Sequence, residues 1–516
     1  MIGTVWSLLP PLLAIGLAIA THRVYLSLGL GVVAGTALVA GLHPVETARL
    51  LFLHYLPLPF QDWDHIKLLA FTILRGATVG LMNDSGGTAG LVARLVRHAY
   101  TKARAQVLAG VAGLVIFFDD YANILILGPT FRPVFDRLRV SRAKLAYIAD
   151  STGSADASFA LISTWIGFEL GLIADALKGL PDPALAALSA YEMFVVSIPY
   201  RFYLHLATAL IFVIAILGRD FGPMLTSERA AARRRAPAPR GERTARIAVG
   251  HWAVAAVPIV LLIVVTLACL IGSGRAKLSA RGELAGAGLR QIVGAADSYA
   301  SLLWAALASF AAALVLTRRR LRGKALWHTL GRGVWVMIPP LAILVLAWAL
   351  GDLCKDLHTG EFVGRTFGAA ARPWAVPTVV FLIGCAMSFA TGTSWGTMAV
   401  LMPIGVPLAW HSATAAGLDP AGAQFTIMLT IASTLAGAVF GDHCSLISDT
   451  TILAALASKC SLVEHFQTQA PYAFLAAIVS VVAGTLPAAL GVSVWICLPA
   501  GLLVLVLSVR VIGRRI

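Results

Sequence analysis

"FGDHCSLISDTT", residues 440–451, is a polar stretch inside one of the most apolar parts of the chain. Two aspartates, a histidine, a cysteine and four hydroxyl side chains share these twelve positions, between "LTIASTLAGAV" and "ILAALA". Ionisable side chains are costly in an apolar span, so their presence there indicates a functional site. The stretch therefore raises the question of what surrounds it.

The rest of the chain is also strongly apolar. Of its 516 residues, 59% are hydrophobic and only 13% are charged, with a mean hydropathy of +0.83. Runs such as "AVAAVPIVLLIVVTLACLIG" (253–272) reach the length of about 20 residues that spans a bilayer as a helix. We therefore predict an all-α polytopic membrane protein with about 11 to 13 hydrophobic segments. The strand alternation of a transmembrane barrel is absent from the sequence.

The basic residues define the organisation of the chain. The formal net charge of +15 does not indicate nucleic-acid binding, because the basic residues lie in short loops, where they set membrane orientation. An arginine-rich stretch, 219–247, is predicted to be a cytoplasmic linker. It separates a first transmembrane repeat (1–218) from a second repeat with a C-terminal helix (248–516).

The two halves resemble each other in short strings. "DDYANILILGP" (119–129) aligns with "TSWGTMAVLMP" (393–403), and "AYIADSTGSADAS" (146–158) aligns with "AVFGDHCSLISDT" (438–450), which pairs Asp150 with Asp442. With the linker inside, the first helices of the halves run in opposite directions. This predicts two inverted-topology repeats, which in secondary transporters hold the substrate on broken helices at the midplane. One hydrophobic stretch, 105–131 or 66–93, is expected to be a re-entrant hairpin, because otherwise the basic loops would not all lie on the cytoplasmic side of the membrane.

Four polar clusters within the apolar segments are the candidate sites. Adjacent helical residues point about 100° apart, so one acid of "FFDDYAN" can face a cavity while the other faces a neighbouring helix. The hydroxyl-rich "ADSTGSADAS" is typical of unwound backbone that faces water or ions. The candidate residues for ion binding and proton coupling are Asp119, Asp120, Asn123, Asp150, Thr152, Asp156, Thr393, Ser394, Thr397, Asp442, His443, Ser445, Ser448 and Asp449.

Other interpretations of these clusters remain open. The aspartates could be structural acids paired with arginines, and the serines could serve close helix packing. The G-x-S-x-G pattern at 392–396 suggests a hydrolase using Ser394 and His443, but it lacks a strand context. Zinc is disfavoured, because no second His–Cys group accompanies His443 and Cys444. Oxygen-rich clusters suit hard cations, which by extension include Na⁺.

At these residues the chain resembles the NhaC-type Na⁺/H⁺ antiporter family. The similar strings are "TGTSWGT", "GDHCS.ISDTT", "FDDYAN" and "ISTWIGFE" (162–169), within a match from Ile66 to Ala473. The resemblance implies a carrier that exchanges Na⁺ or Li⁺ for H⁺ in a bacterial inner membrane, with broken helices and hairpins at its centre. The chain departs from the family in having Leu446 where a proline is usual, and in adding Asp156.

The expected function is therefore secondary active antiport by alternating access, in which Na⁺ and H⁺ compete for buried carboxylates. No phosphate-binding G-x-x-x-x-G-K-[ST] motif occurs, and we expect neither an enzyme activity nor a cofactor. The expected partners are a monovalent cation, a proton and the lipid bilayer, with a homodimer as one form of assembly. The alternative is a Na⁺- or H⁺-coupled carrier of an organic acid or amino acid, with Arg132 or Arg201 as the anion partner.

Overall fold

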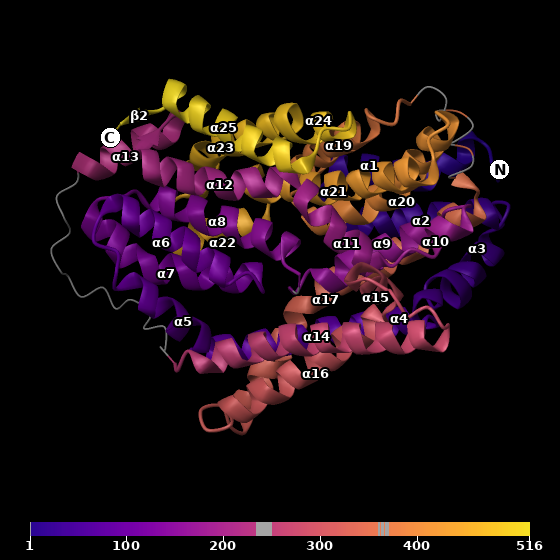
Figure 1. Ribbon diagram of the computed structural model, residues 1–516, viewed down its shortest axis with the longest axis horizontal. Coiled ribbons are helices and arrows are strands. Elements are labelled where there is room, and N and C mark those ends of the chain that lie inside the picture. The colour runs from indigo at the N-terminus through magenta and orange to yellow at the C-terminus, as the bar shows by residue number, and fades with distance from the viewer. Residues whose placement is uncertain are drawn as a thin grey trace.

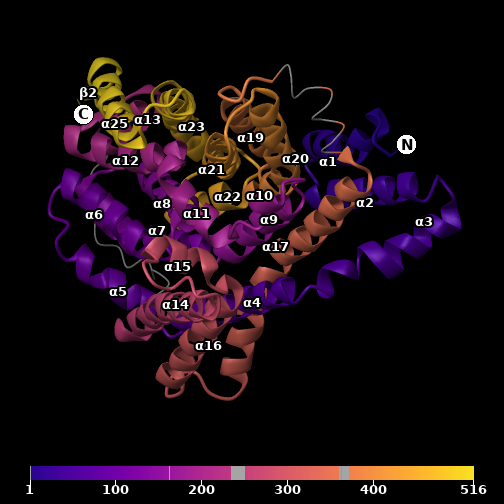
Figure 2. The same ribbon diagram turned by 45° about the vertical axis from the view of Figure 1, so that its right-hand side comes forward.

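The computed structural model describes residues 2–161, 163–233, 250–359, 362, 366 and 371–515. Helices dominate this part of the chain (Figures 1 and 2), and a single antiparallel pair of two-residue strands joins β1 (Arg219–Asp220) to β2 (Arg514–Arg515). Eight described helices are long and apolar enough to cross a membrane, or ten when each of two bent pairs counts as one span. The prediction of an all-α polytopic membrane protein is confirmed. The number of such helices is below the predicted 11 because helices near the candidate site are broken into halves, each of which is too short to cross a membrane alone.

Four long helices form one layer, which lies in the lower part of both views (Figures 1 and 2) except where one of them, α17 (Lys324–Asp356), runs up out of it in Figure 2. The other three are α4 (Trp63–Asp84), α14 (Ala253–Ala280) and α16 (Ser298–Thr317). The backbones of α4 and α17 touch, since a Cβ added at Gly76 would lie 2.5 Å from the backbone oxygen of Gly333. Trp327 and Trp335 of α17 are largely exposed, as expected of side chains that face lipid.

The other elements complete the bundle. In the first half they are η1 (Val5–Leu8), α1 (Leu9–Thr21), α2 (Val24–Val39), α3 (Pro44–Leu50), η2 (Leu51–Tyr55), η3 (Leu58–Phe60), α5 (Gly87–Val96), α10 (Pro183–Ala186), α11 (Ala190–Ser197), η4 (Ile198–Tyr200), α12 (Phe202–Leu217) and α13 (Gly222–Arg233). In the second half they are α15 (Leu289–Ala295), α23 (Leu462–Ser480), η5 (Val481–Thr485), α24 (Leu486–Ala489) and α25 (Val494–Ile512). Of the predicted linker, 219–233 forms β1 and α13, while 234–247 lies outside the described residues.

Two helix pairs fold back on themselves as hairpins. In the pair α6 (Lys102–Val115) and α7 (Asp120–Leu138), the Asn123 side chain donates a 3.0 Å hydrogen bond to the Gly113 carbonyl. In the pair α19 (Val376–Thr391) and α20 (Ser394–Ala415), a Cβ added at Gly405 would lie 3.5 Å from Val380. The expected hairpins are therefore present, and 105–131 is one of the stretches that fold back.

Each hairpin is followed by a broken helix. In the first half α8 (Arg142–Phe159) stops before α9 (Ile166–Lys178), and in the second half α21 (Pro420–Cys444) stops before α22 (Asp449–Ser458). The second break forms without a proline, because Ser445 and Ser448 adopt extended backbone conformations around Leu446. The same succession in both halves is consistent with the predicted repeats, whose inversion stays a prediction.

The helix ends allow Asp442 of α21 to be compared with the two aspartates of α8. Asp156 lies three residues before the end of α8 at Phe159, and Asp442 lies two residues before the end of α21 at Cys444. Asp150 lies six residues further from its break than Asp156 does. By distance from the helix end, Asp442 is therefore more similar to Asp156 than to Asp150, with which the string alignment pairs it.

Helices α19 and α21 are joined through backbone contacts. A Cβ added at Gly441 would lie 2.2 Å from the backbone oxygen of Ser388. The Ser388 hydroxyl donates to the Gly437 carbonyl at 3.1 Å and accepts from the Gly441 N–H at 3.0 Å. Both helices therefore need glycine and a small hydroxyl side chain at this crossing.

Candidate functional site

Three helix breaks meet in the interior. Asp119 caps the start of α7, with its carboxylate accepting the Ala122 N–H at 2.7 Å, and Thr393 caps the start of α20, with its hydroxyl accepting the Gly396 N–H at 3.3 Å. Gly392, before Thr393, has a φ of +68°, a conformation that favours glycine. A Cβ on Gly392 would lie 2.7 Å from the Ile447 side chain, so the second hairpin touches the break between α21 and α22.

Four aspartates gather at these breaks, and we call Asp119, Asp120, Asp442 and Asp449 the acid cluster. Asp120 is close enough to Asp119 and Asp449 to interact electrostatically, and Asp442 is close enough to Asp120 and Asp449. All but Asp449 are buried. The cluster thus brings residues from both halves of the chain together, as the sequence predicts for these four acids.

Hydroxyl groups surround the acid cluster. The Tyr121 hydroxyl donates a hydrogen bond to Asp449 Oδ2, and the Ser394 hydroxyl lies beside Asp442. The other predicted hydroxyls bond mainly to backbone or to each other. Thr397 donates to the Thr393 carbonyl at 2.9 Å, and Ser448 exchanges a 3.0 Å hydrogen bond with Thr450. Most of these side chains therefore shape the breaks, whereas Ser394, Tyr121 and Thr164 lie directly against acids of the cluster.

Asp150 lies in a polar group of its own beside the acid cluster, close enough to Asp442 and Asp449 to interact with them electrostatically. Its Oδ2 accepts from Gln469 Nε2 at 2.9 Å and lies 3.2 Å from His465 Nε2, both on α23. Thr451 links this group to the acid cluster, since its hydroxyl donates to the Asp442 carbonyl at 2.7 Å and lies 3.5 Å from Asp150. Sequence reasoning missed His465 and Gln469. Their spacing of four residues, which places both on one face of a helix, was the available signal.

The remaining predicted residues lie at the edges or apart. His443 Nδ1 is 2.8 Å from the Tyr203 hydroxyl, so it does not pair with Ser394 as a hydrolase would require. The Thr152 hydroxyl donates to the Ile148 carbonyl at 2.9 Å, and the Ser445 N–H donates to the Gly441 carbonyl at 2.8 Å. Asp156 is fully buried but makes no contact with the acid cluster, and neither of its oxygens has a hydrogen-bond partner.

Two buried arginines have opposite surroundings. Arg201 is paired with Glu169 at 3.0 Å, and both side chains are completely buried. Arg75, in the middle of α4, is equally buried, but none of its three side-chain nitrogens has a hydrogen-bond partner. The charge that acts on Arg75 is that of Asp119. Arg201 already has an acidic partner, whereas Arg75, which sequence reasoning missed, has unused donors and is a further candidate for the anion partner of the alternative function.

A cavity connects the acid cluster with the ends of α4 and α17. It has a volume of about 310 Å³ and contains Asp119 and Tyr121 at one end, with Asp84 and Arg332 also in its lining. Asp84 is bonded to Arg332 and to the Thr329 hydroxyl, the latter at 2.6 Å. This cavity lies between the four-helix layer and the first hairpin, and apolar side chains make up most of the wall between its polar residues.

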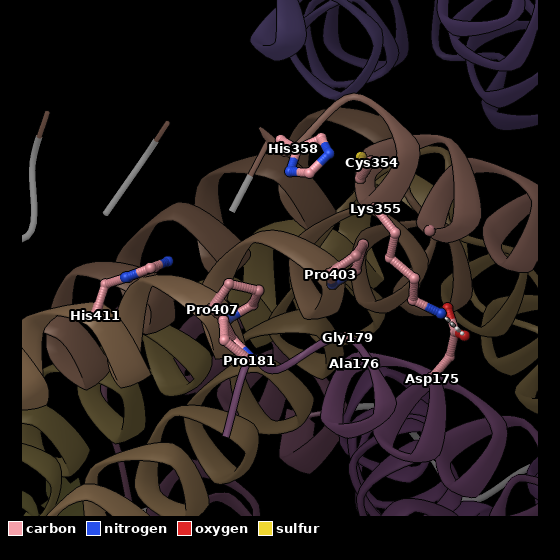
Figure 3. Close-up of a pocket in the computed structure, with 11 residues that line it drawn as sticks. Asp175, Ala176, Gly179, Pro181, Cys354, Lys355, His358, Pro403, Pro407 and His411 are labelled. Atoms are coloured by element: carbon pink, nitrogen blue, oxygen red, sulfur yellow. Dashed lines mark hydrogen bonds and ion pairs between the residues drawn. The ribbon is translucent and has the colours of Figure 1, made fainter. Parts of the chain in front are cut away.

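The pocket in Figure 3 is separate from these acids. It has a volume of about 240 Å³ and lies between α9, α17 and α20. Lys355 reaches across it to Asp175 at 2.9 Å, as the dashed line in Figure 3 shows. None of the predicted site residues lines this pocket.

Among the described residues, no three His, Cys, Asp or Glu side chains are arranged to hold a metal ion. A cation bound at the acid cluster would therefore also need hydroxyl or carbonyl oxygens as ligands.

A model of the Na⁺/H⁺ antiporter family matches residues 157–485, which include α20 to α22 and the breaks between them. The chain belongs to the Na⁺/H⁺ antiporter family. A relative, an uncharacterized protein of Haemophilus influenzae, is 29% identical over 480 residues, covering 91% of this chain and 88% of that protein.

Two solved transporters share the fold of this antiporter-family chain. The YdaH transporter of Alcanivorax borkumensis has a TM-score of 0.59 at 17% identity, covering 91% of this chain and 98% of that one. MtrF of Neisseria gonorrhoeae has a TM-score of 0.56 at 16% identity, covering 91% and 86%. The family and the fold make the protein a multi-pass secondary transporter, which confirms the general class that the sequence predicts.

Proposed function

We propose that the protein exchanges Na⁺ or Li⁺ for H⁺ across a bacterial inner membrane, and that it is of the NhaC type. The observation that carries this proposal is the acid cluster, in which carboxylates from both halves meet at helix breaks. Among the described residues Arg75 is the cation that acts on Asp119, which leaves Asp120, Asp442 and Asp449 without a fixed positive partner. A cluster of this charge attracts either protons or a small cation.

Competition between the two ions follows from this arrangement. Bringing the carboxylates together makes it costly for all of them to be ionised at once, so each state of the cluster holds protons or a metal cation. Asp119 and Asp449 stand at the beginnings of α7 and α22, where the helix dipole favours negative charge. Asp442 lies near the end of α21, where backbone carbonyls and the Ser394 hydroxyl supply neutral oxygens for a hard cation.

Alternating access then exposes the same cluster to the two sides in turn. The cavity that contains Asp119 and Tyr121 is the candidate route on the side of Asp84 and Arg332. By the positive-inside rule this is the cytoplasmic side, because α5 and the loop before α17 carry several arginines. A homodimer remains part of the proposal only as a possible form of assembly.

The test is transport by purified protein in liposomes with an imposed pH gradient. The wild type should dissipate the gradient when Na⁺ or Li⁺ is added, whereas Asp442→Asn and Asp120→Asn should be at least about 100-fold slower, since each removes a titrating carboxylate. Asp64→Asn, at the surface end of α4, is the matched control and should transport normally. Unchanged transport by Asp442→Asn, or no response of the wild type to either cation, would refute the proposal.

A second candidate function is supported by Arg75. A buried guanidinium with five unused donors matches a carboxylate in shape and charge, and MtrF is described as one of a class of antimetabolite efflux pumps. In this alternative the protein carries an organic acid or amino acid, coupled to Na⁺ or H⁺. Uptake of labelled carboxylates that is lost in Arg75→Gln and partly kept in Arg75→Lys would favour it. Cation exchange that persists without any added carboxylate would count against it.

A further inference from the structure

The C-terminal end of the chain carries a group of arginines that no acid among the described residues neutralises. Arg510 is in the last turn of α25, and Arg514 and Arg515 form β2, which pairs with Arg219 and Asp220 of β1. The side chains of Arg510, Arg514 and Arg515 are exposed, and none of the three has a hydrogen-bond or ion-pair partner in the part of the chain that the structure describes. We call these three and Arg219 the arginine patch.

The register of the strand pair concentrates positive charge at one point. Arg219 lies directly opposite Arg515, and side chains opposite each other in such a pair share one face, with their Cβ atoms about 5 Å apart. Arg219 Nη1 donates only to backbone, including the Arg510 carbonyl at 2.6 Å, while Asp220 is buried against Lys144 and does not offset the arginines. Like charges directly opposite each other destabilise a strand pair. An anion bound beside the two guanidinium groups would relieve this repulsion.

The arginine patch continues a surface of α25 that faces lipid. Leu503, Leu507 and Val511 are spaced four residues apart, so they form one row along the helix, and all three are exposed. Arg510 follows Leu507 by three residues and lies on the same face, and Figure 1 shows β2 directly after the end of α25, beside α13. The row therefore passes from hydrocarbon to positive charge at the membrane surface, which is the cytoplasmic surface by the positive-inside rule.

This order of groups matches one class of ligand. A guanidinium binds a phosphate through two parallel N–H donors, and basic residues beside a membrane helix attract anionic lipids. A soluble phosphate would contact the arginines alone, whereas a phospholipid also covers the apolar row with its acyl chains. A zwitterionic lipid brings an ammonium group of its own to the arginines, so it gains less from them. The surface therefore favours a lipid with a net negative headgroup.

We propose that the arginine patch binds the phosphate of an anionic phospholipid, whose acyl chains lie along the exposed row Leu503, Leu507 and Val511. The site shares no residue with the acid cluster, and it does not depend on the ion that the transporter exchanges. β1 leads directly into α13, whose Glu228 accepts the Ser141 N–H at the start of α8. A lipid that stabilises the strand pair therefore also holds α13 against the bundle.

The experiment is native mass spectrometry of the purified full-length protein in a neutral detergent, which counts bound lipids as their concentration rises. The probes are dioleoyl phosphatidylglycerol and dioleoyl phosphatidylcholine, which has the same chains and no net charge. The wild type should bind phosphatidylglycerol at least about 25-fold more tightly, and Arg510→Gln with Arg515→Gln should lose this preference, at about fivefold for each arginine. Arg510→Lys with Arg515→Lys should keep most of it, because the positive charges remain.

The matched control removes two arginines from another basic loop. Arg318→Gln with Arg319→Gln changes two exposed residues at the end of α16, and should leave the affinity for both lipids unchanged. Melting temperatures equal to that of the wild type show that each variant is folded. Equal affinity of the wild type for the two lipids, or equal weakening by the control pair, overturns the proposal. Displacement of phosphatidylglycerol by an excess of glycerol 3-phosphate overturns it too, because the arginines would then bind a soluble phosphate.

Discussion

The buried ion pair between Arg201 and Glu169 predicts an unequal response to losing either partner. The Arg201 guanidinium lies 3.0 Å from Glu169, donates to the Ser158 carbonyl, and donates to the Ser197 hydroxyl at 3.1 Å. The Ser158 hydroxyl donates to Glu169 at 2.7 Å. Both charged side chains are completely buried, so removing one leaves the other in a medium that solvates charge poorly.

The expected losses lie in the range of about 3–5 kcal/mol for breaking such a pair. Arg201→Met should fall near the lower end, about 3 kcal/mol, because the remaining Glu169 carboxyl can take up a proton. Glu169→Gln should fall near the upper end, about 5 kcal/mol, because the guanidinium stays charged at any ordinary pH. The double variant, Glu169→Gln with Arg201→Met, should recover most of the loss because no unpaired charge remains.

The assay is thermal unfolding in a mild detergent, followed by tryptophan fluorescence. The melting temperatures should decrease in the order wild type, double variant, Arg201→Met, Glu169→Gln. Lys178→Met is the control, since its pair with Asp62 is exposed and worth about 0–1 kcal/mol. A double variant no more stable than Arg201→Met would refute this reasoning, and so would full stability with lost transport, which would return Arg201 to the substrate site.

Two further predictions concern packing and pH. Gly441→Ala should destabilise the protein by about 1–3 kcal/mol, because the added Cβ meets a backbone oxygen of α19 at 2.2 Å. Gly16→Ala, whose added Cβ meets open space, should not destabilise it, and the melting temperatures of the two variants test this difference. Outside the spans, burial raises the pKa of Glu228 on α13, although the nearby Lys144 opposes the shift. The contribution of Glu228 to stability is therefore complete below pH 4.5, the ordinary value of its pKa, and is lost as the pH rises through the raised pKa. Glu228→Gln, which keeps an acceptor for the Ser141 N–H, should melt at a less pH-dependent temperature between pH 4 and 8, and an unchanged pH profile would contradict this.

Much of the architecture could be predicted because polar residues in hydrocarbon are rare. The strings around Asp119, Gly392 and Asp442 mark the helix breaks that the structure contains, and the break after Cys444 forms even with Leu446 in place of a proline. The hydroxyls of Thr450 and Thr451 donate to the Asp442 carbonyl near the end of α21, which helps to satisfy this helix end without a proline.

The sequence was less informative about single polar residues in long apolar helices. Arg75 occurs alone in the middle of a span, and nothing local tells whether such a side chain meets a partner, a cavity or a site. Asp150 and Asp156 show the same limit, since both occur in one hydroxyl-rich string but face different surroundings. Their separation follows from which helices pack against α8, and that is a property of the whole bundle.

The crossing of α19 and α21 has a mechanical consequence. Two helices whose backbones touch through Ser388, Gly437 and Gly441 cannot slide past each other without breaking two hydrogen bonds at once. Any movement that turns the binding residues from one side of the membrane to the other must therefore carry both helices together as a rigid block. The slip plane has to lie elsewhere, and the cavity that separates α4 and α17 from the first hairpin reaches the acids at Asp119.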